Sequence, residues 1–122
     1  MSTFNLALTS TLTKGSVVSN VFPQISFADT SINLDAQKDV NVAALATDAQ
    51  ISLDGITAKH LLIKVSATCS IKLNGSSNTA ITLTPSANNP GALILSGCAV
   101  TSLFVTNPGG SALEVNAFYA SE

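Results

Sequence analysis

The clearest structural signal in this chain lies in residues 61–83, which read LLIKVSATCSIKLNGSSNTAITL. Alternate residues from Leu61 to Val65 are apolar, the period of two that is typical of a half-buried β-strand. Two short apolar segments then flank Asn74-Gly75, a pair that tolerates the positive φ angles of a tight turn. The stretch therefore predicts a strand followed by a β-hairpin.

Similar short apolar segments continue on both sides of this stretch, most of them closed by Gly, Pro, Asn or Ser. Pro23 interrupts the second segment and indicates an edge strand, a bulge or a turn. Residues 26–49 favour strand, loop and strand, with a short helix as the competing interpretation. The pattern predicts an all-β fold, an antiparallel β-sandwich of jelly-roll type that forms a single domain over residues 1–122. The segments lie at Phe4 to Leu12, Val17 to Phe22, Ile51 to Leu53, Leu93 to Leu95, Leu103 to Val105 and Leu113 to Tyr119.

The composition is poor in charge and rich in uncharged hydrogen-bonding residues. Asp, Glu, Lys and Arg make up 10% of the 122 residues, against about 25% in ordinary soluble proteins. Ser, Thr and Asn account for 39 residues, and the mean hydropathy is +0.42. Such a surface costs less to desolvate than a charged one. It favours contact with neighbouring subunits, with a stable monomer as the alternative.

Several classes of partner are disfavoured by the charge pattern. The net charge is −2, and the five lysines are scattered singly without any arginine. We therefore expect neither nucleic acid nor a membrane as a partner. The residues that follow Met1 lack the basic and apolar regions of a signal peptide, so we expect a protein that is not secreted through a membrane. Cys69 and Cys98 are expected as reduced thiols, although one disulfide is an alternative.

No catalytic or metal-binding constellation is visible. His60 has no Ser, Cys or acid at a recognisable motif spacing. The five aspartates could supply carboxylates to calcium, but no Asp-x-Asp-x-Asp loop is present, and solvated strand ends are the simpler interpretation. Asn74-Gly75-Ser76 matches a glycosylation sequon and also reads as a hairpin turn. We predict no enzymatic activity, no cofactor and no metal.

Three apolar residues fall on the outward side of their own strands. Leu62, Phe104 and Phe118 alternate with the residues that are expected to face the core. If the strands are half-buried, these side chains need a second layer or another subunit to cover them. We predict that they contact other subunits, the alternative being strands covered on both faces.

The second half of the chain resembles small β-sandwich virion proteins of tailed bacteriophages. The resemblance lies in residues 61–65, the hairpin of residues 70–83, residues 93–95 and residues 101–108. It implies a virion structural protein, most simply a capsid decoration or cement protein that forms a homo-oligomer such as a trimer. It also implies contact with the major capsid or other virion proteins, and a location in the virion after synthesis in the host cytoplasm. A carbohydrate-binding or receptor-binding module of a phage tail or fibre is the alternative.

Overall fold

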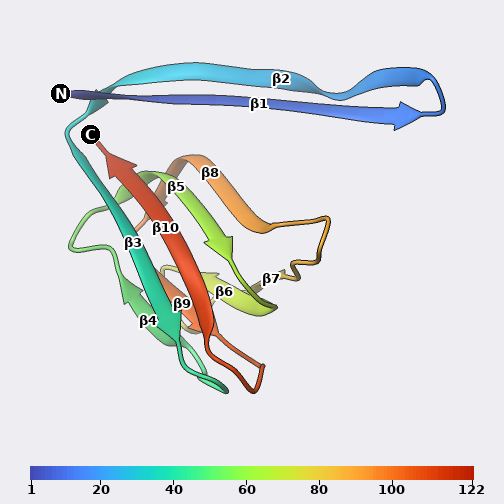
Figure 1. Ribbon diagram of the computed structural model, residues 1–122. Coiled ribbons are helices and arrows are strands. Elements are labelled where there is room, and N and C mark those ends of the chain that lie inside the picture. Colours follow the sequence, from blue (N-terminus) through green and yellow to red (C-terminus); the bar gives the residue numbers. More distant parts are fainter. The chain divides into compact units, whose positions relative to one another are not determined.

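The computed structural model describes residues 1–122 except for the side chain of Phe22, which the sequence placed in an apolar segment and which lies outside the described residues. The chain forms two compact units, Met1–Asn33 and Leu34–Glu122, and each is described by itself. The described part of the chain contains ten strands and no helix (Figure 1). The short helix considered within residues 26–49 is therefore not formed.

The first unit is a two-stranded antiparallel hairpin, which we call the N-terminal hairpin. Strand β1 (Ser2–Lys14) pairs with β2 (Val17–Ile32), and Gly15 makes the turn at a φ of 66°. The register shifts at three places, and at each of them β2 contains the extra residue. Such extra residues are β-bulges, which bend the strand that carries them. Pro23 lies within β2 at one of these shifts, between the partners of Ser10 and Leu8, so the bulge, one of the three interpretations drawn from the proline, is the correct one.

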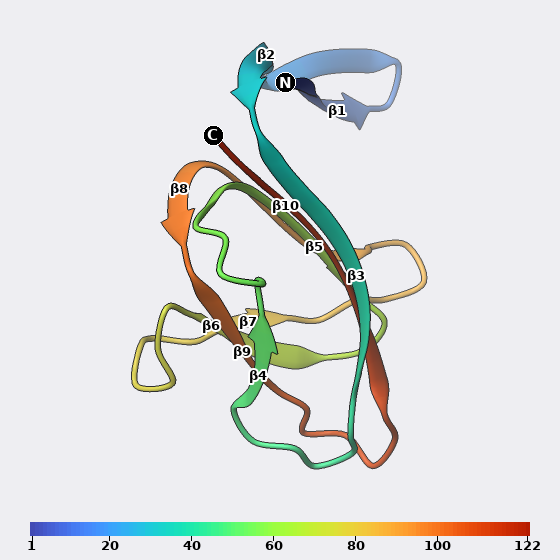
Figure 2. The ribbon, with the colours of Figure 1, turned by 90° about the vertical axis from the view of Figure 1, so that its left-hand side faces the viewer.

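The second unit is a sandwich of two four-stranded antiparallel sheets, shown as two layers in Figure 2. The chain passes between the two sheets several times, and at the shortest of these connections Thr101 is the single residue between β8 and β9. The first sheet has the order β3 (Leu34–Val42), β10 (Leu113–Ser121), β5 (Ala58–Val65) and β8 (Gly91–Val100), and the second has β4 (Ala49–Ser52), β9 (Ser102–Thr106), β6 (Cys69–Leu73) and β7 (Ile81–Leu83).

The core fills the space between these two sheets. Buried side chains alternate from Leu61 to Val65 in β5, along β9, and from Leu113 to Tyr119 in β10, as the period of two predicts. The predicted hairpin is also present, because β6 pairs with β7 and Asn74 takes a φ of 66° in the turn. The all-β antiparallel sandwich is thus confirmed, whereas a single domain over residues 1–122 stays a prediction. The main core residues are Leu53, Leu61, Ile63, Val65, Ile71, Leu103, Val105, Leu113, Val115 and Tyr119.

The side chain of Asn107 forms hydrogen bonds with the loops at one end of the sandwich. Its side chain is 1% exposed, and its Nδ2 lies 3.2, 3.1 and 2.9 Å from the carbonyl oxygens of Val42, Ala43 and Ser111. Its Oδ1 accepts a hydrogen bond from the backbone N–H of Gly109 at 3.0 Å. One amide therefore satisfies backbone groups that buried loops would otherwise leave without partners.

We expect Asn107→Ala to lower the free energy of unfolding by about 3 kcal/mol, because each buried group left without a partner costs about 1–3 kcal/mol. Asn107→Asp should cost more, since a buried carboxylate would face three carbonyl oxygens. Urea denaturation measures both changes. Asn88→Ala, in an exposed turn, is the control and should change stability little. If the parent and the three variants all had the same free energy of unfolding, this role of Asn107 would be contradicted.

Candidate functional site

Two of the three predicted contact residues lie next to each other on the outer face of the first sheet. Phe118 of β10 is directly opposite Leu62 of β5, which is in turn opposite Ile94 of β8. Directly opposed residues share one face of a sheet, so the three side chains form a continuous row across three strands. Gln37 of β3 stands opposite Phe118 and ends the row with a polar group. We call Leu62, Ile94 and Phe118 the outer row.

The outer row borders a shallow hollow of about 260 Å³ whose lining is mostly apolar. Ile94 is 41% exposed, and Leu62 and Phe118 are half-buried. The sequence did not single out Ile94, because it lies between Leu93 and Leu95 and three apolar residues in a row show no alternation. The signal that identifies it is the register of β8 against β5, which only the fold supplies.

Phe104 is not part of the outer row. It lies on β9 of the second sheet, directly opposite Gln50 of β4 and Lys72 of β6. Its side chain is half-buried and points away from the buried Leu103 and Val105 of the same strand. The outward orientation predicted from the sequence is therefore correct for Phe104. The apolar surface that it contributes is separate from the outer row.

The single histidine lies inside the protein. His60 is 2% exposed, and its Nδ1 is 2.9 Å from the hydroxyl of Ser96 on the neighbouring strand. An imidazole beside a serine hydroxyl is part of the machinery of many hydrolases. A catalytic pair must also be reached by its substrate, and this imidazole is closed to solvent. The pair is best understood as the hydrogen bond that satisfies a buried ring nitrogen.

The aspartates are spread over separate partners and form no metal centre. Asp48 lies 2.9 Å from the Nζ of Lys72, and Asp29 accepts hydrogen bonds from Ser31. Asp39 accepts a hydrogen bond from Asn116. Among the described residues, no group of three or more His, Cys, Asp or Glu side chains could hold a metal ion. No helix in this part of the chain is long and apolar enough to cross a membrane.

A charged group on the edge strand β3 joins the two sheets. Lys38 has its Nζ 2.7 Å from Asp54 Oδ1 and 2.8 Å from the carbonyl oxygen of Ser52. The hydroxyl of the buried Tyr119 donates to Asp54 Oδ2 at 2.5 Å. The hydrogen bonds from Lys38 and then Tyr119 lower the pKa of Asp54, and the bond to Asp54 raises the pKa of Lys38. Burial, followed by the bond to Asp54, raises the pKa of Tyr119.

Both cysteines are free thiols in this structure. Cys69 is fully buried, and the half-buried Cys98 has its Sγ 3.3 and 3.2 Å from the carbonyl oxygens of Ala58 and Lys59. Burial raises the pKa of both thiols. Because the thiolate is the reactive form, a raised pKa makes both thiols less reactive near neutral pH. The expected reduced thiols fit this arrangement.

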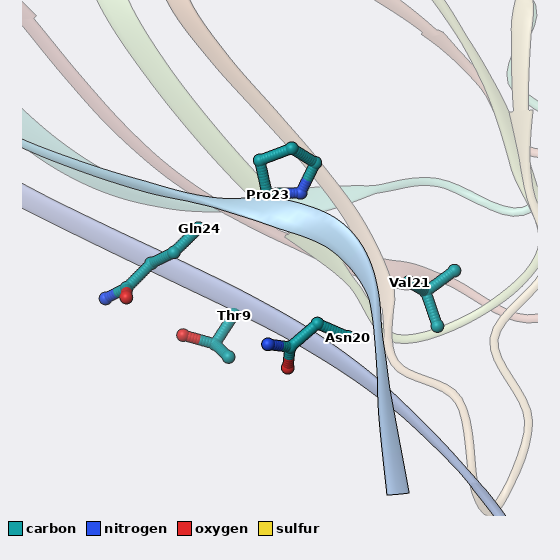
Figure 3. Close-up of a pocket in the computed structure, with 5 residues that line it drawn as sticks. All are labelled: Thr9, Asn20, Val21, Pro23 and Gln24. Carbon is teal, nitrogen blue, oxygen red and sulfur yellow. The ribbon is translucent and has the colours of Figure 1, made fainter.

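A second hollow, of about 300 Å³, lies on the N-terminal hairpin. Figure 3 shows Thr9, Asn20 and Gln24 on one side of β2 and Pro23 on the other. Val21 completes its lining. The hollow offers hydroxyl and amide groups and contains no titratable side chain. It therefore offers no side chain for acid–base chemistry.

Comparison with known proteins returns one weak structural similarity. No family model and no curated protein matches this chain. A solved structure described as Bacillus endospore appendages that form a novel family of disulfide-linked pili is similar over 73% of this chain and 88% of its own. The identity is 14% and the TM-score is 0.44. At this level of similarity, nothing about the assembly of those pili is transferred to this chain.

This finding corrects the resemblance drawn from the sequence, because the similar structure is a pilus subunit and not a bacteriophage virion protein. The capsid decoration role, the phage tail or fibre module and the homotrimer are withdrawn, as are the capsid partner and the virion location. The physical reason is that strand lengths and turn residues specify a β-sandwich, an architecture that serves many unrelated functions.

The bonds of Asp54 predict a dependence of stability on pH. Because its pKa is lower in the folded chain, the stability that Asp54 contributes is present above its unfolded pKa and is lost as the pH falls through the folded pKa. Asp54→Asn should therefore be less stable than the parent at pH 7, and the difference should shrink below about pH 4. Asn also tolerates the positive φ of 57° at this position.

Thermal unfolding between pH 2 and pH 7 measures this difference. Asp35→Asn removes an exposed carboxylate of the same strand, β3, as Lys38 and should give a much smaller difference. Tyr119→Phe removes one hydroxyl and should lower stability by about 1–2 kcal/mol. A constant difference between Asp54→Asn and the parent across the whole range would show that the carboxylate is not held by these bonds.

The buried thiols predict slow modification. With a thiol reagent at pH 8, Cys69 and Cys98 should react at least about tenfold more slowly in the folded chain than in urea, because a buried thiol must become exposed before it reacts. Absorbance of the released reagent gives both rates. Cys98 should be the faster of the two, since it is only half-buried. Equal rates in buffer and in urea would contradict the burial of both residues.

Proposed function

We propose that this chain is a non-enzymatic structural subunit that assembles with copies of itself. The observation that carries the proposal is the outer row, in which three apolar side chains from three strands gather on an outer face of the sandwich. Apolar surface that is contiguous and accessible is typical of protein interfaces. The burial of His60 supports a role without catalysis.

The surroundings of the outer row favour another copy of the chain as its partner. Ser, Thr and Asn make up 39 of the 122 residues, and charged residues only 10%. Two surfaces of this kind can approach each other without desolvating many ions. Burying one Leu, Ile or Phe side chain contributes about 1.5–3 kcal/mol. Leu62 and Phe118 are already half-buried, so each gains only part of this amount, and the three residues together contribute to the free energy of a contact without supplying all of it.

The predicted contact residues divide between two surfaces. Leu62 and Phe118 are proposed to act together, with Ile94 as the third member of the same surface. Phe104 is proposed as a separate contact on the opposite sheet, where its neighbours Gln50 and Lys72 are polar. A subunit with two different contact surfaces can bind two neighbours at once.

We expect Leu62→Ser combined with Phe118→Ser to raise the dissociation constant of the assembly at least about tenfold, because a loss of 1.4 kcal/mol already has that effect. Light scattering over a range of concentrations gives the mass of the assembly. Phe104→Ser, tested alone, reports on the second surface. Thermal unfolding confirms that each variant remains folded.

The matched control is Glu114→Ser, which replaces an exposed residue of β10 that faces the same side of the sheet as Phe118. It should leave the mass unchanged. If the parent chain is a monomer at every concentration up to the millimolar range, the proposed function is wrong. If the parent assembles and the double variant has the same mass, the outer row is not the contact surface.

A further inference from the structure

Three of the four edge strands of the sandwich are protected against pairing with another chain. Strand β3 contains three charged residues, Asp35, Lys38 and Asp39, and Lys38 points inward. Strands β4 and β7 are only four and three residues long. Charged side chains, inward-pointing charges and short length are the usual means by which edge strands avoid pairing.

The fourth edge strand, β8, has no such protection. Its ten residues, Gly91–Val100, contain neither a charge nor a proline. From Gly91 to Ser96 it pairs with β5 in regular register, and among the described residues β5 is the only strand hydrogen-bonded to it. Every second residue of such a strand directs its N–H and C=O toward the open side. Beyond Ser96, Gly97 takes a φ of 68° and the regular register ends.

The N-terminal hairpin has a second unprotected edge. Strand β1 contains no proline, and its only charge is the terminal Lys14. The extra residue of each register shift lies in β2, which also contains Pro23, so the edge of β2 is interrupted while that of β1 is regular. A two-stranded hairpin is only marginally stable in water on its own. Leu8, Leu12, Val17, Val18, Val21 and Ile25 are exposed on it.

We propose that β1 of one copy pairs with β8 of a second copy and so extends the first sheet of that copy by the two strands of the hairpin. The pairing would satisfy the open backbone groups of both strands at once. It would also give the hairpin the support of a sheet that already covers a core. This inference rests on the proposed function, since it names the strands through which copies of the chain meet.

Pairing of β1 with β8 is favoured over pairing of β1 with itself. Two hairpins joined through β1 would form a four-stranded sheet with no sandwich beneath it. Next to β8, the alternating apolar residues Phe4, Leu6 and Leu8 could instead continue the face that contains Ile94. No charged side chain would be buried in this contact, because β8 and residues 2–13 contain none.

Hydrogen exchange of the full chain tests the strand pairing directly. Amides are compared at a concentration at which light scattering shows the monomer and at one at which it shows the assembly. We expect the amides within Gly91–Ser96 that point away from β5, and those within residues 4–13 that point away from β2, to exchange at least about tenfold more slowly in the assembly. Amides of β4 and β7 should not change. Protection of the open-side amides of Gly91–Ser96 already present in the monomer would overturn the inference, as would added protection of only one of the two strands.

A matched pair of variants tests the edge of β1. Ala7 and Ser26 are exposed and directly opposite each other on the hairpin, so Ala7→Lys and Ser26→Lys place the same charge on β1 and on β2. Ala7→Lys should raise the dissociation constant at least about tenfold, and Ser26→Lys should change it less than about twofold. Equal effects of the two variants would overturn the inference.

The outcomes separate this inference from the proposed function. A chain that never assembles contradicts both. A second outcome is that the chain assembles, that substitution of Leu62 and Phe118 abolishes assembly, and that Gly91–Ser96 shows no added protection. This outcome supports the proposed function and contradicts the pairing of β1 with β8. Assembly with protection of both strands supports both.

Discussion

The period-two alternation of β5, β9 and β10 is the constraint on which the rest of the structure depends. Leu61, Ile63 and Val65 must all face the second sheet, because a shift of one residue would turn all of them to the opposite face. The same alternation fixes what remains outside. Once these residues face the core, Leu62 has to face outward, and the register of β10 places Phe118 beside it. The outer row is thus a direct consequence of how the core is packed.

Scarcity of charge has different effects at different edges of the molecule. On β3 the few charged residues are concentrated, and Lys38 reaches across to Asp54 and so joins the two sheets. On β8 and β1 there is almost none, so their open backbone groups meet no electrostatic barrier to a partner strand. A protein with ordinary charge content would usually place a lysine on such strands. The positions of the charged residues therefore say more about which strands can pair with another chain than the net charge of −2 does.

Local features of the fold were predictable from the sequence, whereas features that depend on strand pairing were not. The alternation identified the core face of β5 and the outward side chains of Leu62 and Phe118, and Asn74-Gly75 identified a turn. The position of Ile94 in the outer row depends on the register of β8, and the contact of Lys38 with Asp54 joins β3 to the turn that follows β4 of the other sheet. No local pattern encodes either contact, because each arises only when separate strands meet.

The N-terminal half also contains features that the sequence predicts and features that depend on strand pairing. The segment around Pro23 was correctly expected to be irregular, since proline cannot donate a backbone hydrogen bond. A helix within residues 26–49 was a reasonable alternative, because the Ala-rich and charged stretches there suit a helical turn. The pairing of β3 with β10 along nine residues decides against it. Tertiary pairing thus outweighed local propensity in this segment.

The proposed pairing also constrains the symmetry of the assembly. Strands β1 and β8 are different surfaces of the chain, so a contact between them is heterologous and leaves one free β1 and one free β8 at the ends of a pair. Such a contact closes into a ring only if the rotation between neighbours divides a full turn, and otherwise it continues as an open chain. The outer row lies on the same sheet as β8. It can therefore be covered by the same neighbour whose hairpin extends that sheet, so that backbone pairing sets the register and apolar contact adds stability.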